Sequence, residues 1–112
     1  MNKTKDRLLK RYQAELQSIV GQIIRKYRPE KIILFGSLAR GEYHEGSDID
    51  LFIVKSNSPE LGVERIRELD RLIRYRIGVD FIVYKPEEVE ERISLGDPFV
   101  KAILKEGKVL YG

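Results

Sequence analysis

Two aspartates, Asp48 and Asp50, stand two residues apart in a stretch that is otherwise apolar. In a strand, side chains at this spacing point to the same face. At a separation of about 4 Å, two carboxylates repel each other by roughly 1–4 kcal/mol, depending on the local dielectric. A divalent cation such as Mg²⁺, which prefers hard oxygen ligands, removes that cost, so the pair indicates a metal site. The alternative is that the pair only caps the solvent-exposed start of the strand, and the spacing alone leaves this open.

A second feature, Gly36-Ser37, precedes Asp48 by ten intervening residues and follows a short apolar run. A strand that ends in Gly-Ser and enters a helical turn presents backbone N–H groups and a hydroxyl at a positive helix end, an arrangement that binds phosphate. Its alternative is an ordinary strand-to-helix turn with a serine cap. A phosphate cradle and a carboxylate pair on adjacent strands together predict a site for a metal-bound nucleoside triphosphate.

A third carboxylate, Asp80, lies in the apolar run Val79-Asp80-Phe81-Ile82-Val83. A lone acid in such a strand is costly unless it is paired or bound to a metal. If this strand lies beside that of Asp48 and Asp50, the three acids share one edge of the sheet and can bracket two Mg²⁺ ions. The alternative is that Asp80 only caps the strand after Gly78.

The elements that must position these residues follow from apolar periodicity and from glycine and proline breaks. Their order predicts an α/β (α+β) fold, a small β-sheet flanked by helices, in one domain over residues 1–112. Ser58 is expected to cap the long central helix, whose arginine-rich face we expect to be solvated. Helices are predicted over residues 1–27, 36–40 (a short turn), 59–76, 87–93 and 98–106, and strands over 31–35, 47–54, 79–84 and 108–111.

Composition excludes several other classes of site. The chain has 112 residues, no cysteine and one histidine, His44, so disulfides, thiolate zinc sites, cysteine nucleophiles and a Ser-His-Asp triad are not expected. No apolar run approaches the roughly 20 residues of a membrane helix, and no secretory signal is visible, so we expect a cytoplasmic protein. The net charge of +3 comes from interleaved bases and acids, a pattern that speaks against a nucleic-acid-binding module.

The pattern Gly36-Ser37-Leu38-Ala39-Arg40-Gly41, followed by Ser47-Asp48-Ile49-Asp50-Leu51, resembles the signature of the nucleotidyltransferase superfamily, the DNA polymerase beta-like fold. The short length resembles the minimal nucleotidyltransferases (MNT), and more narrowly the MntA-type antitoxins of MNT/HEPN toxin–antitoxin pairs. The likeness extends to the Val79-Asp80-Phe81 strand and to the tail that ends at Leu110-Tyr111. It implies a small mixed sheet of the polymerase beta palm type.

The resemblance also implies roles for the acids. Asp48 and Asp50 would bind two Mg²⁺ ions, and Asp80 would complete the site and help to deprotonate the acceptor. ATP would be the nucleotide. The acceptor would be a tyrosine hydroxyl of a HEPN-type toxin, which would receive AMP, so that the chain acts as an antitoxin.

Four further residues receive assignments. Gly36 and Ser37 would hold the β- and γ-phosphates. Arg40 would steady phosphate or the following loop, or form a structural salt bridge. His44 is expected to be exposed rather than catalytic. The main alternative is a non-catalytic antitoxin that neutralises its partner by binding alone, and the sequence leaves a homo- or hetero-oligomer open.

Overall fold

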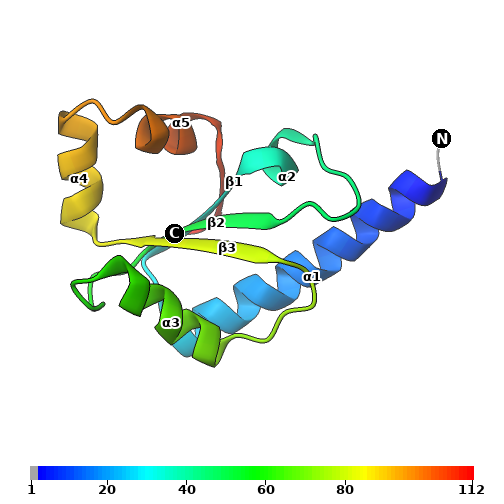
Figure 1. Cartoon of the computed structure of the whole chain (residues 1–112), viewed down its shortest axis with the longest axis horizontal. Helices are drawn as coiled ribbons and strands as arrows, with labels where there is room; N and C mark the ends of the chain where they lie inside the picture. Colours follow the sequence, from blue (N-terminus) through cyan, green and yellow to red (C-terminus); the bar gives the residue numbers. More distant parts are fainter. Residues whose placement is uncertain (1–2) are drawn as a thin grey trace.

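The computed structural model describes residues 3–112 and places four strands in one mixed sheet, in the order β3-β2-β1-β4 (Figure 1). The central strands β1 and β2 are antiparallel to each other. On the outer sides, β4 pairs with β1 in antiparallel orientation and β3 pairs with β2 in parallel orientation. A parallel neighbour needs a crossover, and a helix supplies it between β2 and β3. The mixed sheet with flanking helices confirms the predicted fold class. The strands are β1 (Lys31–Phe35), β2 (Ile49–Val54), β3 (Val79–Tyr84) and β4 (Lys108–Tyr111).

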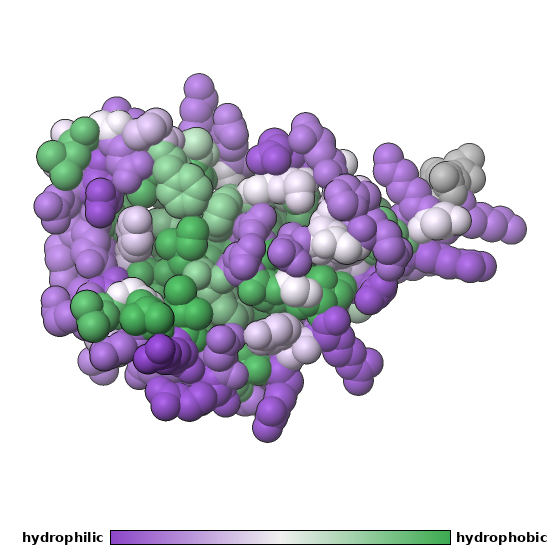
Figure 2. All heavy atoms as spheres, viewed as in Figure 1, coloured by the Kyte–Doolittle hydropathy of each residue, from purple (hydrophilic) through white to green (hydrophobic). Residues whose placement is uncertain are grey.

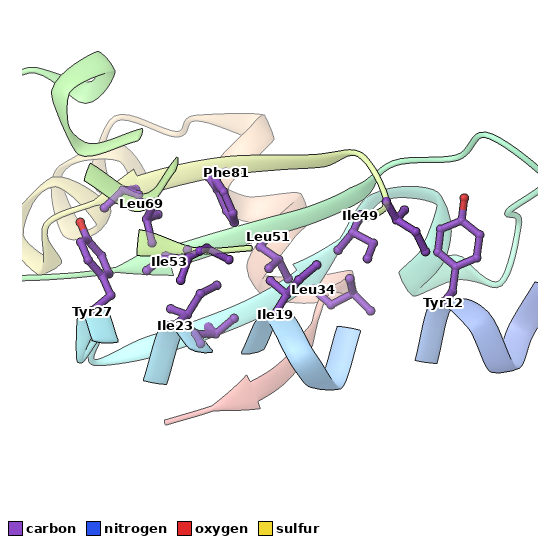
Figure 3. Close-up of a cluster of buried hydrophobic side chains, with 14 residues drawn as sticks. Tyr12, Ile19, Ile23, Tyr27, Leu34, Ile49, Leu51, Ile53, Leu69 and Phe81 are labelled. Atoms are coloured by element: carbon purple, nitrogen blue, oxygen red, sulfur yellow. The ribbon is translucent and has the colours of Figure 1, made fainter. Parts of the chain in front are cut away.

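Helices cover both faces of this sheet. On one face, Ile19 and Ile23 of the long first helix and Leu69 of the crossover helix pack against Leu51 and other strand residues, and Figure 3 shows these side chains pointing toward one another. A smaller cluster on the other face joins the sheet to the last helix. The helices are α1 (Lys3–Tyr27), α2 (Gly36–Arg40), α3 (Gly62–Leu72), α4 (Pro86–Ser94) and α5 (Pro98–Glu106).

The hydropathy of the surface follows this arrangement. Figure 2 shows hydrophobic side chains gathered over the middle of the molecule, where the sheet lies, and hydrophilic side chains over the protruding end of α1. Although α1 has 25 residues, it is amphipathic. Within residues 3–112, none of the helices combines the length and the apolar character that crossing a bilayer requires.

Most of the predicted elements are confirmed, with bounds that agree to within a residue or two. The first helix is confirmed from residue 3 onward, and residues 1 and 2 of the prediction lie outside the described part. β2 is shorter than predicted and begins at Ile49. The reason is that Ser47 is held in a turn: its hydroxyl accepts from the His44 N–H (2.8 Å), and its carbonyl accepts from the Tyr12 hydroxyl.

The central helix α3 is also shorter than predicted, at both ends. Ser58 is not its cap, because the Ser58 hydroxyl donates to the Lys55 carbonyl (2.9 Å) and the helix begins after Leu61. Its C-terminal end lies before residue 74, because the backbone N–H and carbonyl of Arg74 both bond to the Gln22 side chain, at 2.8 and 2.7 Å. A residue whose backbone N–H and carbonyl both bond to a side chain of another helix cannot form the backbone hydrogen bonds that would extend its own helix.

The prediction of a fully solvated arginine-rich face on α3 is wrong at Arg65, which is only 2% exposed. Its guanidinium donates to the Val83 carbonyl (3.0 Å) on the edge of β3 and to the Glu60 carbonyl (3.0 Å), and it pairs with the Glu88 carboxylate at 2.6 Å. These bonds satisfy a buried charge that would otherwise be costly. Arg65 thus joins α3, α4 and the edge of β3.

Candidate active site

Asp50 and Asp80 lie directly opposite each other on neighbouring strands. The parallel register of β2 and β3 pairs Ile49 with Val79, Asp50 with Asp80 and Leu51 with Phe81. Because alternate residues share a face, the two carboxylates lie on the face opposite to Leu51 and Phe81, which belong to the α1/α3 core. The condition set by the sequence, that the third acid lies beside the pair, is therefore met for Asp50.

This juxtaposition changes the chemistry of Asp50. The pKa of its carboxyl is raised to about 6. Burial is the largest cause, followed by the charge and hydrogen bond of the neighbouring Asp80 and by the charge of Asp48, while the charge of Arg40 acts in the opposite direction. Like charges directly opposite in a sheet are destabilising. The site therefore favours either a shared proton or a bound cation.

Asp48 lies slightly apart from this pair. Its side chain is exposed and its carboxylate lies over Gly78, so close that a Cβ built on Gly78 would be 2.2 Å from Asp48 Oδ1. Within residues 3–112 no three His, Cys, Asp or Glu side chains converge in a geometry that could hold a metal ion. The structure thus brings Asp50 and Asp80 together, and it places the Asp48 carboxylate against Gly78.

The donor set nevertheless fits a hard divalent cation. Three carboxylates at one edge supply the oxygen ligands that Mg²⁺ prefers. The Asp50 carboxyl, whose pKa is raised by burial and by its acidic neighbours, is the group whose ionised form a cation would stabilise most. Asp50 and Asp80 lie side by side for such an ion, and Asp48 is exposed.

Gly36 connects the strand-to-helix turn to the acids. Its φ of +75° is a left-handed conformation, and a Cβ built there would lie 2.1 Å from Asp50 Oδ2. Only glycine adopts this conformation at little cost and also leaves room for the carboxylate. The turn that the sequence predicts as a phosphate cradle is therefore in contact with the predicted metal ligand.

The serine-cap alternative for this turn is not observed. The cap residue of α2 is Phe35, and no side chain caps the helix. Ser37 is half-buried in the first turn, and its carbonyl accepts from the Glu42 N–H at 2.9 Å. The helix has five residues and ends at Gly41, in the left-handed conformation. The first-turn N–H groups of α2 accordingly receive no side-chain cap.

Arg40 and His44 lie at the margin of the site. Arg40 is exposed, its Nε lies 3.2 Å from a Glu42 carboxylate oxygen, and its charge lowers the pKa of Asp50. Both interpretations of Arg40, the salt bridge and a cation beside the site, thus have a structural counterpart. His44 is exposed, as predicted, and its Nδ1 lies 2.7 Å from the Glu45 carbonyl oxygen.

The structure adds two features that the sequence did not reveal. One is the contact between Gly78 and Asp48, whose only signal is a glycine two residues before Asp80. The other is an apolar pocket of about 260 Å³ beside Gly36, with walls from Phe35, Ala39 and the half-exposed Phe99 of α5. No local pattern indicates this pocket, because its walls come from distant parts of the chain. Its position places an apolar surface next to the Gly36-Ser37 turn.

Comparisons with known proteins agree with this geometry. The family model for the nucleotidyltransferase domain matches residues 14–111. A protein of Methanocaldococcus jannaschii named "Putative protein adenylyltransferase" is 37% identical over 98 residues, covering 86% of this chain and 94% of the relative. A second protein of that organism with the same name is 29% identical over 107 residues, covering 86% and 71%.

A solved structure is also similar. The crystal structure of a "putative nucleotidyltransferase" from Sulfolobus solfataricus superposes with a TM-score of 0.64 at 28% sequence identity, covering 81% of this chain and 82% of that one. The family match spans the Gly36 turn, Asp48, Asp50 of β2 and Asp80 of β3. The chain therefore belongs to the nucleotidyltransferase domain family.

Proposed function

We propose that this protein transfers AMP from ATP to a hydroxyl group of another protein. Family membership supports nucleotide transfer, and the names of the two Methanocaldococcus jannaschii relatives support a protein as the acceptor. The observation that carries the proposal is the contact of the Gly36 turn with Asp50, which itself lies opposite Asp80. A phosphate-binding turn in contact with paired carboxylates is what phosphoryl and nucleotidyl transfer need.

In this reaction the acceptor oxygen attacks the α-phosphorus of ATP. A bond forms between that oxygen and phosphorus, the bond from the α-phosphorus to the bridging oxygen breaks, and pyrophosphate leaves with the electron pair. The acceptor proton passes to a carboxylate, and Asp80 is the residue to which we assign this role. Backbone N–H groups of the Gly36-Ser37 turn and the Ser37 hydroxyl hold the β- and γ-phosphates, and Arg40 adds positive charge beside them.

Asp48, Asp50 and Asp80 would hold Mg²⁺ ions, which polarise the phosphate and lower the pKa of the acceptor hydroxyl when bound. The rest of the site is built by the chain itself. Gly36 keeps the carboxylate of Asp50 against the turn, so that phosphate and carboxylate lie in one place. The partial burial of Asp50 excludes water from one side of its carboxylate, and electrostatic effects are stronger where water is excluded.

The finer proposal concerns the acceptor. We propose a HEPN-type toxin as partner and a tyrosine hydroxyl as the group modified, with neutralisation of the toxin as the result. It rests on the resemblance of the Gly36–Gly41 and Ser47–Leu51 patterns to the MNT antitoxins, together with the protein-directed names of the relatives.

The test is AMP transfer to a co-purified HEPN protein, read as the intact mass of that protein after incubation with ATP and Mg²⁺. We expect the mass of one or more AMP groups to be added by the wild type and by Glu90→Gln, which makes the same carboxylate-to-amide change on the exposed side of α4. Asp50→Asn should add none. Transfer by Asp50→Asn at the wild-type rate would overturn the assignment of the site.

A second candidate is neutralisation by binding alone, and the position of Asp48 away from the Asp50–Asp80 pair favours it. The two candidates differ in one measurement. If Asp50→Asn binds the toxin but no longer protects cells from it, catalysis is the mechanism. Protection equal to that of the wild type would show that binding is sufficient and that transfer is not needed.

A further inference from the structure

On the α1 face of the molecule, an open groove of about 600 Å³ lies between α1 and the segment 73–78 that connects α3 to β3. Figure 1 shows this segment running along α1 before it turns into β3. The groove is lined mostly by long polar side chains and is rich in arginine. They are Arg11, Glu15 and Gln22 from α1, and Arg74, Tyr75 and Arg76 from the connecting segment.

Side chains of α1 hold the backbone of the connecting segment at two residues. Gln22, which is 8% exposed, donates to the Arg74 carbonyl (2.7 Å) and accepts from the Arg74 N–H (2.8 Å). Glu15 accepts from the Arg76 N–H at 2.9 Å. The Tyr75 hydroxyl donates to Asp70 (3.1 Å), and its ring packs edge-on against Phe81. The segment is therefore pre-organised, which lowers the entropy lost when it binds a partner.

The same bonds leave two guanidinium groups available. The side chains of Arg74 and Arg76 are exposed, and neither lies within ion-pair distance of a carboxylate in residues 3–112. Arg11 pairs with Glu45 at 3.0 Å, with both groups exposed. The backbone is held by α1 while the arginine side chains remain open to solvent, which is the arrangement of a surface that binds anions.

The groove adjoins the acidic edge. Arg76 lies two residues before Gly78, over which the Asp48 carboxylate lies, and four residues before Asp80. The Gly78 carbonyl accepts from the Ile49 N–H at 2.8 Å, so the segment ends beside the start of β2, where it enters β3. An acceptor protein that carries acidic residues would be repelled by this edge unless a cationic surface beside it compensated.

We infer that this groove, which we name the arginine groove, docks an acidic segment of the acceptor protein. The inference rests on the proposed function for the existence of a protein acceptor and adds the chemistry by which it is recognised. Single carboxylates can pair with Arg74 and Arg76 individually and bidentately. A continuous phosphate backbone fits less well, because Glu15 lines the groove beside the arginines and Glu45 pairs with Arg11.

The test uses a fluorescent random copolymer of glutamate and tyrosine, with binding read by anisotropy in the absence of ATP and metal. Arg74→Gln/Arg76→Gln should weaken binding about tenfold, as expected for the loss of two solvent-exposed ion pairs. The matched control is Arg67→Gln/Arg71→Gln, which removes the same two charges from exposed positions on α3 outside the groove. This control should change the affinity less than about twofold, and both variants should keep the wild-type melting temperature.

Three results would overturn the inference. Equal weakening by the two double variants would mean that only net charge attracts the copolymer. Tighter binding of an oligouridylate than of the copolymer, also lost in Arg74→Gln/Arg76→Gln, would assign the groove to nucleic acid. No binding of the copolymer by the wild type at low salt would exclude the site.

The outcome is separable from that of the proposed function. Binding that depends on the groove, without AMP transfer to any protein, would retain the arginine groove and contradict the transferase proposal. AMP transfer whose KM for the acceptor is the same in Arg74→Gln/Arg76→Gln as in the wild type would retain the transferase and contradict the groove.

Discussion

Gly36 and Gly41 form a matched pair of positions that isolates the contact between the turn and Asp50. Both glycines have a φ of +75°, so an alanine meets the same backbone strain at either position. Their surroundings differ, because a Cβ on Gly36 would lie 2.1 Å from Asp50 Oδ2 and 3.0 Å from its Cγ, whereas a Cβ on Gly41 meets no atom within 4 Å. Any difference between the two alanine variants therefore reports on Asp50.

The expected losses of stability follow from the left-handed backbone at both glycines and from the contact with Asp50 at Gly36 alone. A left-handed alanine costs about 1–2 kcal/mol, and the stiffer unfolded chain returns about 0.4–1 kcal/mol, so Gly41→Ala should lower the free energy of unfolding by about 1 kcal/mol. At Gly36 the carboxylate of Asp50 must also move by about an ångström, and overpacking of this kind adds about 1–3 kcal/mol. Displacing a ligand by this distance should lower AMP transfer about 100-fold in Gly36→Ala, and little in Gly41→Ala.

The assay is urea unfolding followed by circular dichroism, with a double-mutant cycle. In an Asp50→Ala background, where the nearest remaining atom is a Cβ at 3.3 Å, the excess cost of Gly36→Ala over Gly41→Ala should fall to a few tenths of a kcal/mol. The reasoning is refuted if the two alanine variants are equally stable with Asp50 present. It is also refuted if the excess persists after Asp50 is truncated, since the obstruction would then lie elsewhere.

Three further predictions concern the acids and the buried arginine. The pKa of Asp50 is raised from 3.8 to about 6 on folding, so its contribution to stability is full below pH 4 and is lost as the pH rises through 6. Without divalent cations, Asp50→Asn should therefore stabilise the protein at pH 8 by about 1 kcal/mol, a magnitude that takes into account the partial exposure of Asp50 to solvent. At pH 4 the same substitution should leave the stability unchanged. Equal effects on stability at pH 4 and pH 8 would contradict this prediction. Gly78→Ala should leave the rate of AMP transfer within about twofold of wild type, because the new side chain displaces only the exposed Asp48 carboxylate. A loss of rate as large as that of Gly36→Ala would show that Asp48 takes part in the reaction from its position beside Gly78. Arg65→Met should destabilise by about 3 kcal/mol at pH 7, because Glu88 and three backbone carbonyls, those of Pro59, Glu60 and Val83, lose their donor. Arg65 holds the pKa of Glu88 below its usual range, so thermal melts should show the loss shrinking as the pH falls through that lowered value.

The pairing of Asp50 with Asp80 was within reach of the sequence, although its register was not. A long helix between two strands is the usual crossover of a parallel pair, as α3 is between β2 and β3, whereas the five-residue α2 connects the antiparallel strands β1 and β2. Parallel neighbours bring equivalent ends to the same edge. The sequence therefore brings Asp80 near the Asp48/Asp50 strand if the two strands are adjacent. The strand order β3-β2-β1-β4 and the alignment of Asp50 with Asp80 were not predictable. They depend on how α1 and α3 pack on the sheet.

Features set by distant groups were missed for the same reason. The burial of Arg65 depends on Glu88, 23 residues away, and on the Val83 carbonyl, so helical periodicity gives no sign of it. The end of α3 depends on Gln22, which bonds to the backbone of Arg74 across 52 residues. Periodic patterns show which face of a helix packs on the core. Hydrogen bonds from side chains of distant segments decide at which residue the helix ends.

The acidic edge is better explained by function than by folding. At Gly36 and at Gly78 a side chain would collide with a carboxylate oxygen, of Asp50 in one case and of Asp48 in the other. The fold thus leaves out two side chains to admit two acids that repel each other, and it sets Asp80 opposite one of them. An amide or a hydroxyl at either position would have a lower electrostatic cost. What an amide cannot do is bind a cation as strongly or accept a proton, and a site that transfers a nucleotidyl group needs both.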